Sequence, residues 1–284
     1  MTVPTFRDKF LQTPGIRLHY LEWGDRRKPT LLLLHGSLQT AHIWDDFARA
    51  MARDYHLLAL DWRGHGDSGW SKRLSYSSVS FMRDLRRLAA AIAPKRFTLV
   101  GVSLGGHIAI VYGARHPERL QGLVLIEVGP VVNNESLVRS RETAKDQLLL
   151  PSFEDFVQRE AGRNRYRPVE EHRRRLKWSV RQLPNGQWTW KYDHRRMWLM
   201  QQPLDKPLFE SLAPFVPRLK VPTLIVRGGR SDFLPVNVAK QMQQDIGDCS
   251  IVDVPNAGHS VPSDNPTGFT KVVRDFLSSR APAS

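Results

Sequence analysis

One short stretch, residues 98–107, constrains the fold more than any other part of the chain. Its first five residues are mostly apolar and β-prone, and the residues after Gly105 are compatible with a helix. Between them stands the sequence Gly101-Val102-Ser103-Leu104-Gly105. A sharp strand-to-helix turn requires glycine on both sides of the serine, because a side chain there would collide with neighbouring backbone. The stretch therefore predicts a nucleophile elbow that exposes the Ser103 hydroxyl at a helix N-terminus.

The segments around this elbow alternate between two kinds of pattern. Short apolar runs predict strands over residues 16–23, 30–34, 56–60, 97–102, 121–128, 222–227 and 250–254, and longer segments between several of them predict helices. Strands that alternate with helices in this way predict an α/β fold, with a mostly parallel sheet and helices on both faces. Residues 131–217 lack this alternation of strand and helix patterns. We therefore expect a core of residues 1–130 and 218–284, with residues 131–217 as a mostly helical cap.

Three further strand ends carry residues that suit catalysis. Asp232 follows one predicted strand, His259 follows another, and His35-Gly36-Ser37 follows a third. In an open parallel sheet, functional groups gather beyond the carboxyl ends of the strands. A serine hydroxyl needs an adjacent base to become a nucleophile, and histidine titrates near neutral pH. The order serine, acid, histidine is thus compatible with acyl transfer.

This order resembles the α/β-hydrolase fold family, in particular its serine esterase-like members with a helical cap. The similarity extends to the segment 61–68 after one strand and to the segment 116–126 after the elbow helix. The resemblance implies Ser103 as nucleophile, His259 as general base and acid, and Asp232 as the residue that orients the imidazole. It further implies an oxyanion hole made of the backbone N–H groups of Leu104 and Ser37. Glu127, at the end of its own strand, stays open as an alternative acid, since some members of the fold place the acid there.

The predicted function is hydrolysis of a carboxylic ester or related acyl compound, through an acyl-enzyme and without a cofactor. Lactonase, carbon–carbon bond hydrolase and cofactor-free perhydrolase activities use the same triad, so these alternatives stay open. A receptor or signalling protein that keeps the triad is the alternative from another class. Haloalkane dehalogenases and epoxide hydrolases of this fold carry aspartate where Ser103 stands, which argues against both.

Other polar residues near these strand ends have structural interpretations. His35, His65 and His107 are expected to pack or hydrogen-bond near the site, and Asp61, Arg63 and Asp67 to hold their loop. Cys249 is expected to be an inert buried thiol. The histidines and carboxylates show no compact metal-ligand spacing, and no phosphate-binding or dinucleotide fingerprint is present, so we expect no metal.

The cap segment combines aromatic and basic residues. Trp178, Trp188, Trp190 and Trp198 are candidates for a substrate-binding wall, although such residues also hold small helical caps together. Between residues 159 and 181 the chain carries nine basic residues and three acidic ones. Such a surplus either steers an anionic substrate, such as a carboxylate-bearing ester, or forms the solvated face of a helix.

Composition and charge indicate the class of binding partner and the cellular location. The chain has 284 residues, 25% of them charged, and a net charge of +14. No nucleic-acid motif accompanies this charge, so we expect a small-molecule partner and no nucleic acid. No apolar run is long enough to span a membrane, and the first residues contain no hydrophobic signal core. The single cysteine fits a reducing compartment, so a cytoplasmic location is expected.

Overall fold

The central element of the fold is an eight-stranded sheet. We describe it from a computed structural model, in which residues 5–131, 135, 148–195 and 210–280 are described. The strands are β1 (Arg7–Thr13), β2 (Ile16–Trp23), β3 (Thr30–Leu34), β4 (His56–Leu60), β5 (Phe97–Val102), β6 (Leu120–Ile126), β10 (Thr223–Gly228) and β11 (Cys249–Val254).

The sheet is mixed, with one antiparallel end. The strand order is β1-β2-β4-β3-β5-β6-β10-β11. β1 pairs with β2 and β2 with β4 in antiparallel fashion, whereas every other neighbouring pair is parallel. The predicted fold class, a mostly parallel sheet, is confirmed. β1 was not predicted, because its residues alternate between partly buried and exposed and include few apolar side chains.

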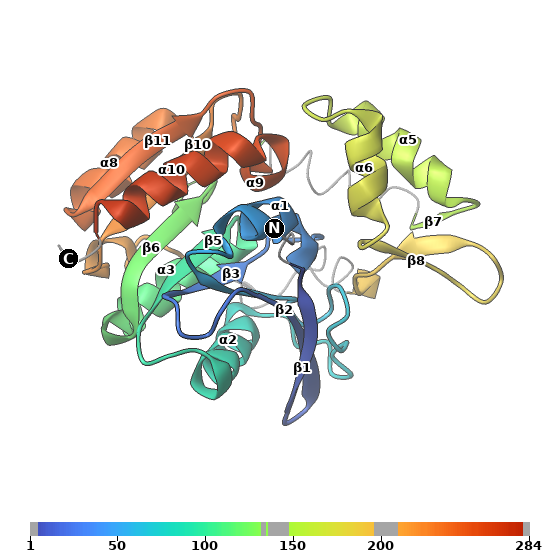
Figure 1. Cartoon of the computed structure of the whole chain (residues 1–284), viewed down its shortest axis with the longest axis horizontal. Helices are drawn as coiled ribbons and strands as arrows, with labels where there is room; N and C mark the ends of the chain where they lie inside the picture. Colours follow the sequence, from blue (N-terminus) through green and yellow to red (C-terminus); the bar gives the residue numbers. More distant parts are fainter. Residues whose placement is uncertain (1–4, 132–134, 136–147, 196–209, 281–284) are drawn as a thin grey trace.

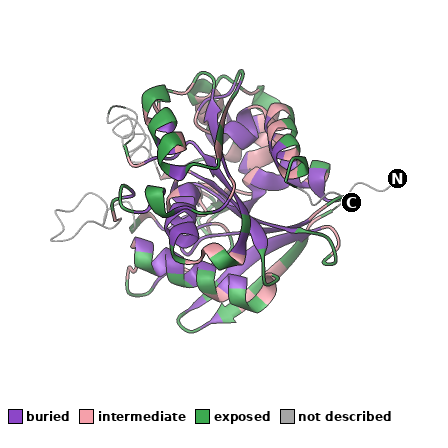
Figure 2. Cartoon of the chain, turned by 90° about the vertical axis from the view of Figure 1, so that its left-hand side faces the viewer, coloured by how far each residue is buried: buried purple, intermediate pink, exposed green. Residues whose placement is uncertain are grey.

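Helices cover both faces of the sheet (Figure 1). On one face lie α2 (Ser78–Ile92), α3 (Leu104–Arg115) and α8 (Val236–Ile246), and on the other lie α1 (Asp45–Met51) and α10 (Pro266–Ser278). Strand β3 shows why the sheet needs both layers. Its side chains alternate, so that Leu32 and Leu34 join the first core while Leu31 and Leu33 join the second. The buried residues of the sheet run through the middle of the molecule in Figure 2.

Short elements complete the core. They are the 3-10 turns η1 (Ala41–Trp44), η2 (Pro117–Arg119) and η3 (Val216–Arg218), and the helix α9 (Val261–Asp264). The turn η1 and helix α9 each follow a strand end, and the two contact one another. They bring the chain segments after β3 and β11 together.

A second group of elements lies between β6 and β10 in the sequence and stands apart in Figure 1. It comprises β7 (Leu149–Leu150), α5 (Phe153–Arg163), α6 (Val169–Leu176), β8 (Val180–Gln182) and β9 (Trp188–Trp190). The three strands form an antiparallel sheet in the order β7-β9-β8. The segment predicted as a mostly helical cap therefore also contains a small sheet.

The helix α5 has a defined start. The Ser152 hydroxyl accepts a hydrogen bond from the Asp155 N–H, and the Asp155 carboxylate accepts one from the Ser152 N–H. This capping box satisfies two N–H groups that the first turn leaves unpaired. Among the described residues, no helix combines the length and the apolar character needed to cross a membrane.

Candidate active site

The structure confirms the geometry expected of the elbow. Ser103 connects β5 directly to α3 and has a φ of 51°, a conformation rare for residues other than glycine. A Cβ atom on Gly105 would lie 2.2 Å from the Leu34 carbonyl oxygen, and one on Gly101 would lie 2.5 Å from the Gly105 backbone. Gly105 therefore allows helix α3 to lie close to strand β3, and Gly101 allows its first turn to lie close to strand β5. Ser103 is thereby held in a strained turn at the helix N-terminus.

His259 reaches the same cavity as Ser103 from a different strand end. It lies in the segment between β11 and α9, and its imidazole packs against Phe233 with ring centroids 4.0 Å apart. Ser103 and His259 both line a cavity of about 300 Å³. The His259 side chain is 37% exposed, so its ring is accessible from this cavity. A serine and a histidine at one cavity are the two groups that nucleophilic acyl transfer needs.

The carboxylate that contacts His259 belongs to Glu127. Glu127 Oε2 lies 3.3 Å from His259 Nδ1, and Glu127 is completely buried just after β6. Its other oxygen, Oε1, accepts a hydrogen bond of 2.8 Å from the Gly228 N–H, and Oε2 accepts one of 2.5 Å from the Ser231 hydroxyl. Like Ser103, Glu127 has a φ of 51°. The Gly228 N–H and the Ser231 hydroxyl thus hold the carboxylate beside Nδ1 of His259.

Asp232 was the predicted acid. The structure places it in the exposed loop between β10 and α8, beside Ser231. Glu127, the alternative that the sequence left open, is hydrogen-bonded to the imidazole, and the choice of Asp232 or Glu127 as the orienting acid stays a prediction. Sequence reasoning preferred Asp232 because its loop resembles the family pattern. The available signal for Glu127 was an acidic residue directly after a strand with an apolar carboxyl half, where a buried charge needs a function or a partner.

The segment after β3 lies against the nucleophile. A Cβ atom on Gly36 would lie 3.4 Å from the Ser103 Cβ atom, so the chain passes close to the serine. The Gly36 N–H donates to the Gln39 side chain at 2.9 Å, which holds this turn. Ser37 lines the cavity with Ser103, and Leu104 is the first residue of α3. This placement is compatible with the predicted oxyanion hole, which stays a prediction.

Histidines near the site have hydrogen-bond partners that give them structural roles. His35 Nε2 accepts a hydrogen bond from the Trp62 N–H, so its Nδ1 carries the proton and donates to the Gly36 carbonyl. His65 Nδ1 lies 3.0 Å from the Arg63 carbonyl oxygen. Burial lowers the pKa of His107 to about 4, which leaves this imidazole neutral near pH 7.

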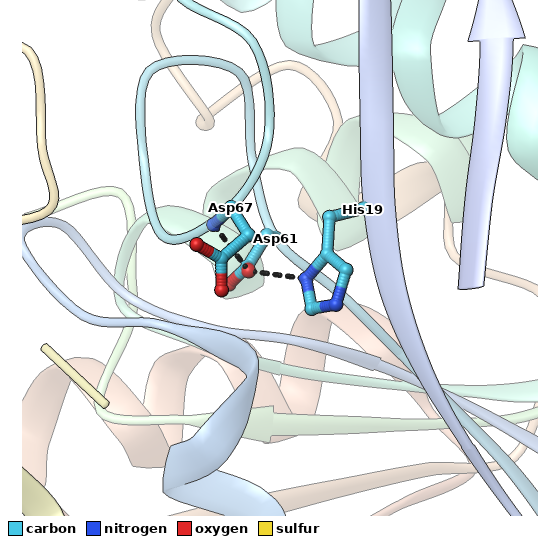
Figure 3. A group of neighbouring side chains, drawn as sticks. All are labelled: His19, Asp61 and Asp67. Atoms are coloured by element: carbon cyan, nitrogen blue, oxygen red, sulfur yellow. Dashed lines mark hydrogen bonds and ion pairs between the residues drawn. The ribbon is translucent and has the colours of Figure 1, made fainter. Parts of the chain in front are cut away.

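His19, Asp61 and Asp67 form a compact group whose possible ligand atoms lie within 4.8 Å of one another, as in a metal site (Figure 3). Asp61 accepts hydrogen bonds from the Ala41 N–H, the Asp67 N–H and His19 Nδ1. Burial alone would raise the pKa of Asp61, but its hydrogen bonds to His19 and the backbone lower it. Both carboxylate oxygens of Asp61 already accept hydrogen bonds from N–H groups. We therefore infer that the group connects β2 to the loops after β3 and β4. Gly66, with a φ of 54°, allows the chain to wrap around this carboxylate.

The four candidate tryptophans lie in different places. Trp190 lines the cavity with Ser103. Trp178 stacks on His42, with ring centroids 4.1 Å apart, and Trp188 packs on Phe153 inside the cap. Trp198 lies outside the described residues. Of the three candidates that lie in the described part of the chain, Trp190 is the one that lines the cavity.

The comparisons with known proteins follow this geometry. Residues 29–266 match the family model described as alpha/beta hydrolase fold. The chain belongs to this family. It is 31% identical to Esterase Rv0045c of Mycobacterium tuberculosis, over 92% of this chain and 86% of the esterase. It is 26% identical to human monoacylglycerol lipase ABHD6, over 89% of this chain and 76% of the lipase. A solved structure of an alpha/beta hydrolase from Novosphingobium aromaticivorans superimposes with a TM-score of 0.86 at 25% identity, and covers 97% of this chain and 99% of that one.

Proposed function

We propose that this alpha/beta hydrolase cleaves a carboxylic ester or a related acyl compound through an acyl-enzyme on Ser103. The observation that carries the proposal is the shared cavity of Ser103 and His259, with Glu127 hydrogen-bonded to the far side of the imidazole. The names of the relatives agree with this chemistry, since one is an esterase and another a monoacylglycerol lipase.

The first half-reaction transfers the acyl group to the enzyme. Ser103 Oγ attacks the ester carbonyl carbon while His259 Nε2 accepts the hydroxyl proton. The carbonyl oxygen becomes an oxyanion, for which the N–H groups of Leu104 and Ser37 are the proposed donors. The imidazolium then gives the same proton to the leaving alkoxide, the carbon–oxygen bond breaks, and the alcohol departs.

The second half-reaction repeats these roles with water. His259 takes a proton from water, the resulting hydroxide equivalent attacks the acyl carbon, and the proton returns to Ser103 Oγ as the carboxylic acid leaves. The proposed role of Glu127 is to accept a hydrogen bond from Nδ1–H throughout. This contact keeps Nε2 free to accept protons and stabilises the imidazolium.

The proposal also divides the chain into a catalytic core and a cap. We assign residues 131–217 to a cap over the active site and residues 1–130 and 218–284 to the catalytic core. Cap residues from α5, α6 and β9 line the cavity together with Ser103, which supports this division.

We also propose a cytoplasmic location, because a chain with a single cysteine, Cys249, suits a reducing compartment. Burial raises the pKa of the Cys249 thiol to about 12, so this cysteine forms little thiolate near neutral pH.

The test combines turnover with covalent labelling. Short-chain p-nitrophenyl esters are assayed with the parent protein and with Ser103→Ala, and both are treated with a fluorophosphonate probe. We expect the variant to lose roughly a thousandfold or more in kcat, and the probe to add to Ser103 in the parent alone. A parent that neither turns over esters nor labels at Ser103 contradicts the proposed function.

A further inference from the structure

The cap brings three arginines to the cavity of Ser103. Arg163 is the last residue of α5, Arg175 lies on α6, and Arg167 lies between the two helices. Glu160 is the one acidic side chain among the residues that line the cavity, so the described wall has a surplus of positive charge. The basic surplus noted in the sequence thus points, in part, into the active site and not only toward solvent.

The arginines of this wall are held in place by ion pairs with neighbouring carboxylates. Arg167 Nε lies 3.2 Å from Asp264, and Arg163 Nη1 lies 3.1 Å from Glu160. The Asp46 carboxylate is shared by three guanidinium groups, including that of Arg175. The ion pairs between described residues at this wall form three groups: Asp46 and Glu171 with Arg49, Arg174 and Arg175, Glu160 with Arg159 and Arg163, and Asp264 with Arg167.

Two of the three lining arginines are largely removed from water. The side chains of Arg167 and Arg175 are 16% and 12% exposed. Burial lowers the pKa of both guanidinium groups, although each has a carboxylate nearby. Largely buried guanidinium groups that line a cavity favour an anion inside it, because the anion offsets the cost of removing their charge from water.

The rest of the cavity limits what such an anion is attached to. Trp190, Leu176 and Ile43 give it apolar surface, and its volume is about 300 Å³, at the low end for ligand pockets. We propose that the substrate is a small ester that carries a carboxylate group, which Arg163, Arg167 and Arg175 bind while the ester group lies at Ser103. This inference rests on the proposed function and names the substrate class for the same site. Guanidinium groups suit the task because they bind carboxylates through two parallel N–H donors.

The experiment uses three esters of similar size. Monoethyl adipate carries a carboxylate on the acyl side, carboxymethyl hexanoate carries one on the alcohol side, and ethyl hexanoate is neutral. Acid release is followed with a pH indicator at low ionic strength. We expect one of the two anionic esters to exceed ethyl hexanoate in kcat/KM by about tenfold or more, and the side that is favoured shows how the substrate lies.

Variants separate anion binding from support of the cap. Arg163→Gln removes a lining charge at a side chain that is 26% exposed. Arg173→Gln is the matched control, because Arg173 pairs with Glu154 and Glu170 on the outer surface and is not among the lining residues. Arg163→Gln should raise KM for the anionic ester about fivefold or more and leave ethyl hexanoate within about twofold, whereas Arg173→Gln should change neither. Arg163→Lys should recover part of the loss.

The outcomes are distinguishable. Equal kcat/KM for neutral and anionic esters, or equal losses on all three in Arg163→Gln, overturns the carboxylate proposal while the hydrolase stands. Failure of all three esters together with absent fluorophosphonate labelling of Ser103 overturns the proposed function instead.

Discussion

At the scale of single residues, two of the proposed catalytic groups have a strained backbone. Ser103 and Glu127 both have a φ of 51°, and they stand at the carboxyl ends of the neighbouring strands β5 and β6. Each such conformation costs roughly 1–3 kcal/mol for a residue other than glycine. The surrounding contacts hold them there, through the Ile126 carbonyl on the Ser103 N–H and the Val226 carbonyl on the Glu127 N–H. The fold therefore holds strained residues at two neighbouring strand ends, and one of them, Glu127, contacts His259.

The close approach at the elbow gives a prediction for two glycines in helices. A Cβ atom on Gly105 would lie 2.2 Å from the Leu34 carbonyl oxygen, whereas one on Gly162 in α5 meets nothing within 4 Å. Gly105→Ala should lower the free energy of unfolding by about 3 kcal/mol or more through this overlap. Gly162→Ala should instead raise it by about 0.5–1 kcal/mol, since alanine favours a helix. Urea unfolding of both variants checks the pair, and a stable Gly105→Ala protein would contradict the described elbow.

Residue patterns predict the turn around Ser103 directly, whereas they leave the choice between Glu127 and Asp232 as the acid open. The glycine spacing around Ser103 reflects local crowding, which any sequence with this turn must satisfy. Glu127 and Asp232 both follow strands in the sheet, so position along the chain does not choose between them. The choice depends on which carboxylate lies next to the ring nitrogen of His259, and that is set by packing between β6, β10 and the loop after β11.

At the scale of elements, burial on both faces made the central strands predictable. Strands β3, β4 and β5 are buried along their whole length and contain long apolar runs. The strands of the cap are two or three residues long and include arginine, glutamine and tryptophan. Such short, half-exposed strands have no detectable period, so the cap sheet could not be predicted from the sequence.

The ion pairs of Glu22 give a pH-dependent prediction for the antiparallel end of the sheet. Burial alone would raise the pKa of Glu22, but hydrogen bonds from Arg26 and from His56 on β4 lower it to about 2. The unfolded chain therefore binds a proton more readily than the folded one between about pH 4.5 and 2, and this stabilisation is lost as the pH falls through that range.

Glu22→Gln isolates this effect, because all other carboxyl groups titrate in both proteins. We expect the variant to be less stable than the parent by about 1–2 kcal/mol at pH 7, and the difference to shrink steadily below about pH 4.5. Urea midpoints measured from neutral pH to about pH 3 give the result. A difference that stays constant over this range would mean that the Glu22 charge does not hold β2 to β4.

At the scale of the whole molecule, polar and charged contacts connect the proposed cap to the proposed core. The Asp46 carboxylate on α1 contacts Arg174 and Arg175 on α6, and the Tyr76 hydroxyl donates to buried Asp193 at 2.5 Å. Lys191 also reaches Asp67 in the loop after β4. The net charge of +14 is therefore not spread evenly over an inert surface, since several arginines connect the cap to the core over the cavity.

The Asp46 carboxylate should therefore contribute more to the free energy of unfolding than an exposed ion pair does. Asp46→Asn leaves three guanidinium groups with one fewer carboxylate and should lower the free energy of unfolding by about 1–2 kcal/mol. Asp54→Asn, which removes an exposed pair with Arg274, should stay within about 0.5 kcal/mol of the parent. Equal effects in the two variants would show that Asp46 does not hold the cap.

The central prediction concerns which carboxylate accepts the hydrogen bond from His259 Nδ1 during catalysis. Glu127→Gln keeps the size of the side chain but removes the charge beside Nδ1, and Asp232→Asn makes the same change in the exposed loop. Both are compared with the parent by kcat/KM on one p-nitrophenyl ester, after unfolding curves show that each variant is folded. Glu127→Gln should lose roughly a thousandfold to ten-thousandfold, as loss of the orienting carboxylate does in serine hydrolases, while Asp232→Asn should stay within about threefold. A large loss in Asp232→Asn with near-parent activity in Glu127→Gln would contradict the proposed triad of Ser103, His259 and Glu127.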